Sequence, residues 1–453
     1  MDPNAGARPR PVSGLLTDFY ELSMATVYHA ESMNDEAVFE LFFRELPRQR
    51  NFVIACGQED CLRFLADFRL GDEELDYLAS LERFPRAFLE RLRRLGFSGD
   101  VWAVPEGSVV FPFEPVIQVR APLIEAQLIE TLLLNRIHSQ SGLASKAARI
   151  VLAAEGRPVM DFGARKASGT DGALALARSA WIAGAAGTSN VEAGWRYGIP
   201  VLGTMAHSYI QAFDDETRAF ERFIRQWPET TLLVDTWDTL QGVDRVIELV
   251  RSQGAERLPV RAIRLDSGDL GQLSRAARER LDAAGLQEIG IVASSGLDEY
   301  RIRELLDDGA PLDGFGVGTR LATLADAPDI DFAYKLAEYA DQPRMKASTN
   351  KATYPGAKQV WRQQHRGRMQ GDWISAVDED PPRDAEPLLH PVMEGGELLP
   401  GAMPGLEDAR ARAARELAAL PGALRALDRA EAGYPVAISE QLQRARAEGT
   451  STP

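Results

Sequence analysis

Two residues in the stretch from Gly203 to Phe213 have side chains suited to chemistry, His207 and Ser208. They follow an apolar run, Gly198 to Leu202, which is short enough for a buried strand of a parallel sheet and is ended by a glycine. An isolated histidine is more often structural than catalytic, so its neighbours decide the interpretation. The position predicts that His207 stands where a strand ends and a helix begins.

Polar residues of complementary chemistry follow four other predicted strands. They are Asp161 to Arg165 (DFGAR), Arg264 to Asp269 (RLDSGD), Ala293 to Gly296 (ASSG) and Gly314 to Thr319 (GFGVGT). In an α/β barrel the carboxyl ends of all strands open onto one rim, where binding and catalytic sites lie. We therefore expect these segments to meet His207 at one rim.

The alternation of strands and helices after Gly156 predicts a parallel sheet. Strands are expected near 159–162, 187–189, 201–205, 231–235, 260–265, 289–294 and 314–317, with helices between them. About seven such units in one run favour a barrel over an open sheet, although periodicity alone permits both. We expect an N-terminal α/β domain over 1–135, a barrel domain over 136–345 and a less regular C-terminal segment over 346–453.

Composition and charge narrow the class of partner. The chain has 453 residues, of which 45% are hydrophobic and 26% charged, and its formal net charge is -16. Such an acidic protein is expected to bind neither nucleic acid nor a membrane surface, but a local cationic pocket could still take a small anion. Two cysteines form no disulfide framework, and no leader or membrane-spanning segment is evident, which together predict a cytosolic location.

The glycines of Gly314 to Thr319 and the loop Ser294 to Gly296 are candidates for phosphate binding. Backbone N–H groups can converge where Cβ atoms are missing, and such a nest binds a phosphate monoester. Glycine-rich turns are also common without any ligand. Because the two loops follow neighbouring strands, they could form two sides of one cradle.

Asp266 and Arg264 permit two interpretations. A carboxylate at a strand end can accept hydrogen bonds from a vicinal diol such as a ribose, and Arg264 on the same side of the strand could meet an anion. Alternatively, the two side chains pair with each other as a salt bridge. Asp269 is expected to cap the helix that starts near Leu270.

Five motifs, in order, resemble the nicotinate phosphoribosyltransferase family. They are LLTDFY containing Tyr20, DFGAR from Asp161, GTMAHS from Gly203, DSGD from Asp266 and GVGT ending at Thr319. The resemblance runs from about residue 15 to residue 360, with a weaker similarity at residues 434–436. It implies transfer of phosphoribose from 5-phosphoribosyl-1-diphosphate to nicotinate, coupled to ATP hydrolysis. It also implies an irregular parallel α/β barrel, an N-terminal α/β domain completed by the C-terminal segment, and a homodimer with active sites at the subunit boundary.

The resemblance also implies roles for single residues. His207 matches the histidine that ATP phosphorylates, close to a diphosphate and Mg²⁺ whose protein ligands are not assigned. Phe162 and Tyr20 of the other subunit would sandwich the pyridine ring, and Asp266 would hold the ribose hydroxyls. Thr204 and Arg264 match nicotinate positions, and Arg165 would lie in the same pocket. The 5-phosphate would be received by Gly296, Gly316, Gly318 and Thr319, and Ser208 and Ser294 are further candidate substrate-binding residues.

Ser189, after Gly187 and Thr188, bears on the choice between acid and amide. The related nicotinamide enzyme has an aspartate at this position, which would repel the carboxylate of nicotinate, whereas a serine hydroxyl can donate to it. The sequence thus favours nicotinate. Alternatives are a nicotinamide or quinolinate phosphoribosyltransferase, or a barrel that binds a phosphorylated ligand without turnover. One departure from some relatives is Lys166, where a second arginine is expected.

Overall fold

The computed structural model describes residues 12–253, 259–346 and 353–449. Its contacts divide the chain into two compact units, one formed by Met1–Ser145 with Asp326–Pro453 and the other by Lys146–Ala325. Helix α6 (Glu130–Ala153) contains the first division point. The domain boundaries expected at 135/136 and 345/346 stay predictions.

The first unit is built on a seven-stranded sheet with the order β13-β12-β1-β5-β3-β17-β18. Its strand β1 (Glu36–Phe43) is paired on both sides and is buried at every position but the first, as its largely apolar sequence requires. The other strands of this sheet are β3 (Asp100–Ala103), β5 (Ile117–Pro122), β12 (Phe332–Tyr339), β13 (Gln342–Pro343), β17 (His390–Glu394) and β18 (Glu397–Leu398). Strands from both ends of the chain therefore share one sheet and one core.

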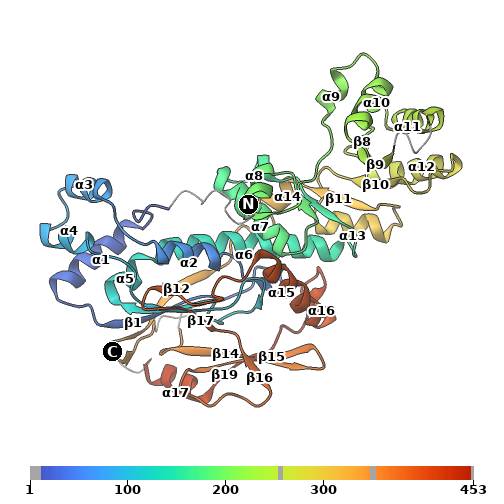
Figure 1. Ribbon diagram of the computed structural model, residues 1–453. Helices are drawn as coiled ribbons and strands as arrows, with labels where there is room; N and C mark the ends of the chain where they lie inside the picture. Colours follow the sequence, from blue (N-terminus) through green and yellow to red (C-terminus); the bar gives the residue numbers. More distant parts are fainter. Residues whose placement is uncertain (1–11, 254–258, 347–352, 450–453) are drawn as a thin grey trace. The chain divides into compact units, whose positions relative to one another are not determined.

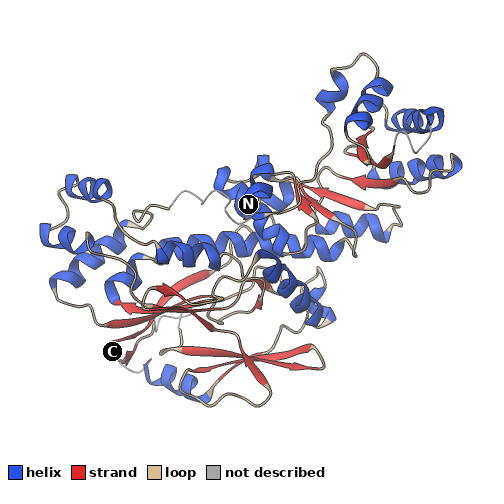
Figure 2. Cartoon of the chain, viewed as in Figure 1, coloured by secondary structure: helices blue, strands red, loops and turns tan. Residues whose placement is uncertain are grey.

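Helices (Figures 1 and 2) and a separate pair of short antiparallel strands accompany this sheet in the first unit. Residues 72–92 form two separate helices, and Pro85 is the N-cap residue of the second. The elements are α1 (Phe19–Ala30), α2 (Gln58–Ala66), α3 (Asp72–Ser80), α4 (Arg86–Leu92), α5 (Leu123–Leu128), and the paired strands β2 (Val53–Ile54) and β4 (Val109–Val110).

The C-terminal segment is more regular than expected. It forms a four-stranded sheet with the order β16-β14-β15-β19. Its elements are β14 (Lys358–His365), β15 (Arg368–Ala376), β16 (Ala385–Pro387), α15 (Leu406–Ala419), α16 (Gly422–Arg425), β19 (Val436–Ile438) and α17 (Glu440–Gly449). The expectation that regularity fades here was wrong, because buried ion pairs hide the usual strand pattern. Part of the polar stretch 346–358 lies outside the described residues.

A buried ion pair and a buried arginine attach this segment to the N-terminal part of the same unit. Lys358 Nζ donates to both carboxylate oxygens of Glu40 at 2.9 and 2.8 Å. Arg362 pairs with Asp372 at 2.6 Å and donates to the carbonyl oxygen of Val109 at 2.8 Å. The N-terminal domain is therefore completed by the C-terminal segment, which confirms that prediction.

The second unit is built on a parallel sheet with the order β7-β6-β11-β10-β9-β8. Val201 adds a single parallel bridge to Thr188 beyond β7. Numbered along the chain, these seven strand positions lie in the order 3-2-1-7-6-5-4. This is the cyclic order of a barrel whose third and fourth strands are not paired, which confirms the irregular parallel α/β barrel.

The predicted strand 201–205 is reduced to that one bridge. Leu202 N–H donates to the Thr188 carbonyl at 2.9 Å, and after Gly203 the chain leaves the sheet. Across the resulting seam, the N–H of Leu233 on β8 donates to the sulfur of Met205 at 3.2 Å. The barrel is thus opened directly before His207.

The remaining elements of the second unit agree closely with the predicted alternation. The strands are β6 (Val159–Asp161), β7 (Gly187–Thr188), β8 (Thr230–Leu233), β9 (Val260–Leu265), β10 (Gly290–Ala293) and β11 (Gly314–Val317). The helices are η1 (Ala164–Lys166), α7 (Gly169–Ile182), α8 (Val191–Tyr197), α9 (His207–Gln211), α10 (Glu216–Gln226), α11 (Thr239–Gln253), α12 (Leu270–Ala283), α13 (Glu299–Asp307) and α14 (Thr319–Ala322). Asp269 caps α12 as predicted, accepting from the Gln272 N–H at 3.0 Å.

Two further features concern the environment of the chain. Among the described helices, none combines the length and apolarity that crossing a bilayer requires. Cys56 and Cys61 are buried free thiols, in agreement with the expected lack of a disulfide. The cytosolic location stays a prediction.

Candidate active site

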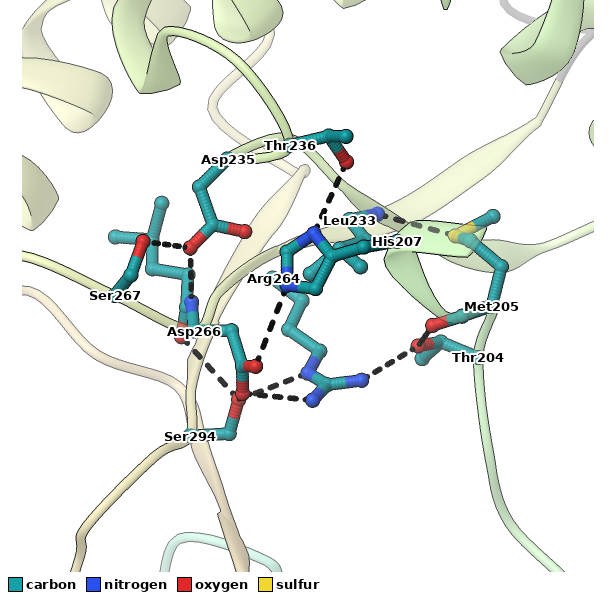
Figure 3. A network of polar contacts seen from close by, with 11 residues as sticks. Thr204, Met205, His207, Leu233, Asp235, Thr236, Arg264, Asp266, Ser267 and Ser294 are labelled. Carbon is teal, nitrogen blue, oxygen red and sulfur yellow. Dashed lines mark hydrogen bonds and ion pairs between the residues drawn. The ribbon is translucent and has the colours of Figure 1, made fainter. Parts of the chain in front are cut away.

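Arg264 is the centre of a polar network at the carboxyl edge of the parallel sheet (Figure 3). Its guanidinium donates to Asp266 Oδ1 at 2.7 Å, to the Ser294 hydroxyl at 2.8 Å and to the Thr204 hydroxyl at 3.1 Å. These partners come from the ends of β9 and β10 and from the segment after Val201. The salt bridge considered as the alternative for Arg264 and Asp266 is therefore present, and it is part of a larger network.

His207 lies between two polar partners in the same network. Its Nδ1 is 3.1 Å from the hydroxyl oxygen of Thr236, and its Nε2 is 3.6 Å from Asp266 Oδ2. The residue starts α9 after an extended Ala206, and 38% of its side chain is exposed. The imidazole is thus oriented on both nitrogens and still accessible from solvent.

The charge on Asp266 is stabilised by its neighbours. Burial alone would raise the pKa of this carboxyl group, but hydrogen bonds from the Ser294 hydroxyl and Arg264, together with the nearby His207, lower the pKa below its usual value. The backbone N–H of Asp266 donates to Asp235 Oδ2 at 2.9 Å, which fixes the residue further. Asp266 is therefore an ionised, oriented carboxylate near neutral pH.

The ring of Phe162 packs within this network. The guanidinium carbon of Arg264 lies 5.4 Å from the ring centroid, a cation–π distance. A Cβ on Gly316 would come within 2.5 Å of the ring, so only glycine leaves room for Phe162 there. This is a packing reason for a glycine that the sequence assigned to phosphate binding.

The two loops expected to cradle a phosphate follow neighbouring strands. β10 and β11 pair in parallel, with Ala293 opposite Phe315. Ser295 and Gly296 both have positive φ values, 77° and 65°, so this loop turns sharply after Ser294. Gly318 precedes α14, which begins at the exposed Thr319.

Three predicted residues lie at the same edge but outside the hydrogen-bond network described above. Arg165 is exposed in η1 after β6, Ser189 is exposed directly after β7, and Ser208 is exposed in the first turn of α9. Tyr20 belongs to the first unit, on α1, where 47% of it is exposed. Burial and the carboxylates Glu130, Glu21 and Asp18 raise the pKa of its phenol.

Sequence reasoning missed Asp235 and Thr236. Asp235 is 7% exposed and accepts from the Ser267 hydroxyl at 2.5 Å as well as from the Asp266 N–H, while its Oδ1 is buried without a hydrogen-bond partner among the described residues. The signal was available, because Asp235 ends a predicted strand of the same sheet and Thr236 follows it. They were passed over because neither belongs to a glycine-rich or histidine motif.

No cluster of three or more His, Cys, Asp or Glu side chains suited to a metal occurs among the described residues. This does not conflict with Mg²⁺, which is usually held by one or two carboxylates and by substrate phosphates. The orphan oxygen of Asp235 and the carboxylate of Asp266 are donors of that kind.

Sequence comparison covers most of the chain. Residues 15–138 match the nicotinate phosphoribosyltransferase (NAPRTase) N-terminal domain, residues 158–351 the NAPRTase family and residues 381–446 the nicotinate phosphoribosyltransferase C-terminal domain. The chain belongs to the nicotinate phosphoribosyltransferase family. It is 53% identical to the nicotinate phosphoribosyltransferase pncB2 of Mycobacterium tuberculosis over 431 residues, which are 95% of this chain and 92% of the relative.

Solved structures agree with the family assignment. Human nicotinic acid phosphoribosyltransferase matches with a TM-score of 0.83 and 31% identity, covering 96% of this chain and all of that one. A structure of nicotinate-nucleotide pyrophosphorylase from Pyrococcus furiosus matches with a TM-score of 0.74 and 26% identity, covering 89% of this chain and 95% of that one. The fold of this chain is thus the fold of the family.

Proposed function

We propose that this chain transfers the phosphoribosyl group of 5-phosphoribosyl-1-diphosphate to the ring nitrogen of nicotinate, with ATP hydrolysis coupled through His207. The products are nicotinate mononucleotide and diphosphate, a step of NAD biosynthesis. The family membership supports the reaction. The observation that carries it is the network in which Arg264 contacts Phe162, Asp266, Thr204 and Ser294 at one strand edge.

Nicotinate would bind on the face of Phe162. Arg264 lies over that ring, and Thr204 and Ser189 offer hydroxyl donors from neighbouring segments. A planar acid suits this combination, since the aromatic face takes the pyridine ring and the donors take the carboxylate. Arg165 and Ser208 supply exposed polar groups at the same edge.

The sugar phosphate would lie along the neighbouring strand ends. Asp266, ionised and held by three neighbours, is suited to accept from the two ribose hydroxyls. The loops at Gly296 and at Gly318 with Thr319 would receive the 5-phosphate through backbone N–H groups. Because the pyridine nitrogen has a free lone pair, no base is needed, and catalysis rests on orientation and on neutralising the departing diphosphate.

His207 would accept the γ-phosphoryl group of ATP on a ring nitrogen, releasing ADP. The ring is accessible and oriented by Thr236 and Asp266. Mg²⁺ would be held by Asp235 and Asp266 with phosphate oxygens, and it supplies charge neutralisation for the diphosphate. The phosphorylated histidine, once hydrolysed, returns the site to its starting state.

A second subunit would complete each site with Tyr20. Phe19, Tyr20 and Val27 on α1 and Leu16 just before it are exposed apolar side chains, between 42% and 57% accessible in a single chain. Such a surface favours burial against another chain. This supports the homodimer with shared active sites.

The proposal is tested by an assay with nicotinate, the activated ribose, ATP and Mg²⁺. Formation of nicotinate mononucleotide with release of ADP is expected. Parallel reactions with nicotinamide and quinolinate separate the alternative transferases. Ligand-dependent shifts in melting temperature without any mononucleotide product would instead indicate a barrel that binds phosphorylated ligands.

A further inference from the structure

We infer that Asp161 is a positioning residue which joins the two loops that form the walls of the nicotinate pocket. One loop carries Phe162 and the other carries Ser189, and the inference rests on the proposed function for the identity of the ligand. Asp161 is the last residue of β6 and 1% exposed, so it does not touch a substrate itself.

The carboxylate of Asp161 bonds to both loops at once. Its Oδ1 accepts from the backbone N–H of Gly163 at 2.8 Å, on its own loop. Its Oδ2 accepts from the Thr188 hydroxyl at 2.7 Å, at the end of the neighbouring strand β7. One buried carboxylate therefore fixes the distance between the ends of two strands.

The bond to Thr188 continues into the loop of Ser189. The Thr188 hydroxyl oxygen accepts from the Asn190 N–H at 3.1 Å, and the Asn190 side chain caps α8 by accepting from two further N–H groups. The N–H of Ser189 itself donates to the carbonyl oxygen of Asp161 at 2.8 Å. Ser189 is thus held on both sides by residues that depend on Asp161.

The wall at Phe162 has little freedom. The Phe162 N–H donates to the Val317 carbonyl at 2.8 Å, and its ring lies against Gly316. A Cβ on Gly163 would approach Asp161 Oδ1 to 3.1 Å and a Leu176 methyl group to 2.7 Å, so this turn is tightly enclosed. We therefore expect a small displacement of Asp161 to move the Phe162 ring, because the enclosed turn leaves no room to adjust.

Burying a carboxylate is costly unless its oxygens are well bonded. An amide could not replace it without loss, because Asn has one acceptor oxygen and its NH₂ group can only donate. Asp161 can serve both loops because both of its oxygens accept.

Thr188→Val and Thr188→Ser test the inference without altering the carboxylate. Valine keeps the shape of threonine and removes the hydroxyl, whereas serine restores it. For Thr188→Val we expect the KM for nicotinate to rise about tenfold, from one lost hydrogen bond to a charged group. We expect kcat and the KM for 5-phosphoribosyl-1-diphosphate to stay unchanged, the preference for nicotinate over nicotinamide to fall, and Thr188→Ser to recover most of the loss.

Asp161→Asn should raise the same KM, and Asp313→Asn is its control. Asp313 also accepts a backbone N–H, from Ile291 at 2.8 Å, but it precedes β11 at the opposite edge of the sheet. This control should leave the KM for nicotinate unchanged.

An unchanged KM for nicotinate in Thr188→Val, or no recovery in Thr188→Ser, would overturn the inference. Wild-type protein that forms no mononucleotide would overturn the proposed function instead. In that case a melting-temperature titration with nicotinate still decides the inference. A ligand shift lost in Thr188→Val and kept in Thr188→Ser supports it, and no shift in wild type, or equal shifts in both variants, contradicts it.

Discussion

Replacing Arg264 by lysine separates the charge of this residue from its fork of donors. Lysine keeps the positive charge near Asp266, but it cannot reach the hydroxyls of Ser294 and Thr204 at the same time. Only 13% of the Arg264 side chain is exposed, so water does not compensate for the lost bonds. The variant therefore tests whether orientation, rather than charge alone, builds the site.

The structure gives the size of the expected effect. The lysine variant loses one or both of the bonds of 2.8 and 3.1 Å to two neutral hydroxyls, each worth about 1 kcal/mol, so the free energy of unfolding should fall by about 1 to 2 kcal/mol. If the displaced side chain weakens nicotinate binding by about 1.4 kcal/mol, a loss of the same size, the KM for nicotinate should rise about tenfold.

Urea unfolding and steady-state kinetics of four proteins measure the free energy of unfolding and the KM for nicotinate. They are the wild type, Arg264→Lys, Ser294→Ala and the double variant, which together form a double-mutant cycle. We expect a coupling energy of about 1 kcal/mol between the two positions. Arg261→Lys is the control, since this arginine is exposed on the same strand. Effects that simply add, with the KM for nicotinate unchanged, would refute the reasoning.

Other predictions concern residues outside that pair. His207→Ala should abolish stimulation by ATP but leave some ATP-independent synthesis, and full coupling in that variant would remove the phosphohistidine assignment. Ser189→Asp should weaken nicotinate more than nicotinamide in competition assays, whereas equal losses would show that it does not contact the carboxylate. Tyr20→Ala should raise the KM for nicotinate, and its mixture with His207→Ala subunits should regain activity if sites are shared; no recovery would argue against the shared-site dimer. Burial raises the pKa of Glu21 from 4.5 to about 7, although hydrogen bonds from the hydroxyls of Thr17 and Thr131 lower it in part. The folded state therefore takes up a proton in this range, and its stability falls as the pH rises from 4.5 through 7. Glu21→Gln should flatten this dependence in unfolding measurements and be more stable than wild type at pH 8, by up to about 3 kcal/mol; an unchanged pH dependence would contradict it.

The sequence predicted the parallel sheet well because most residues of its strands are apolar and a glycine or polar residue follows most of the strands. Val260–Leu265 and Gly314–Val317 lie where the pattern of apolar runs and glycines indicated. The C-terminal sheet escaped prediction because its strands contain buried charged residues. Lys358 and Arg362 find partners in Glu40 and Glu416, whose distance in sequence no local pattern can reveal.

The candidate site was predicted in part for the same reason. Motifs located Arg264, Asp266 and His207, which the structure brings together. Asp235 was missed, because its contribution lies in bonds to the backbone and side chain of a neighbouring loop. Gly316 was found but explained differently, since the motif suggested a phosphate and the structure gives contact with Phe162.

The open seam of the barrel accounts for the position of His207. If 201–205 continued as a strand beside β8, its backbone would be tied in the sheet and its side chains would alternate between the two faces. Instead the chain leaves after Gly203, so that Thr204 reaches Arg264 and His207 reaches Thr236 and Asp266. The backbone N–H of Leu233, which a paired strand would satisfy with a carbonyl, meets the weaker acceptor sulfur of Met205. The barrel thus lacks strand pairing between Val201 and β8, at the place where the histidine approaches the network.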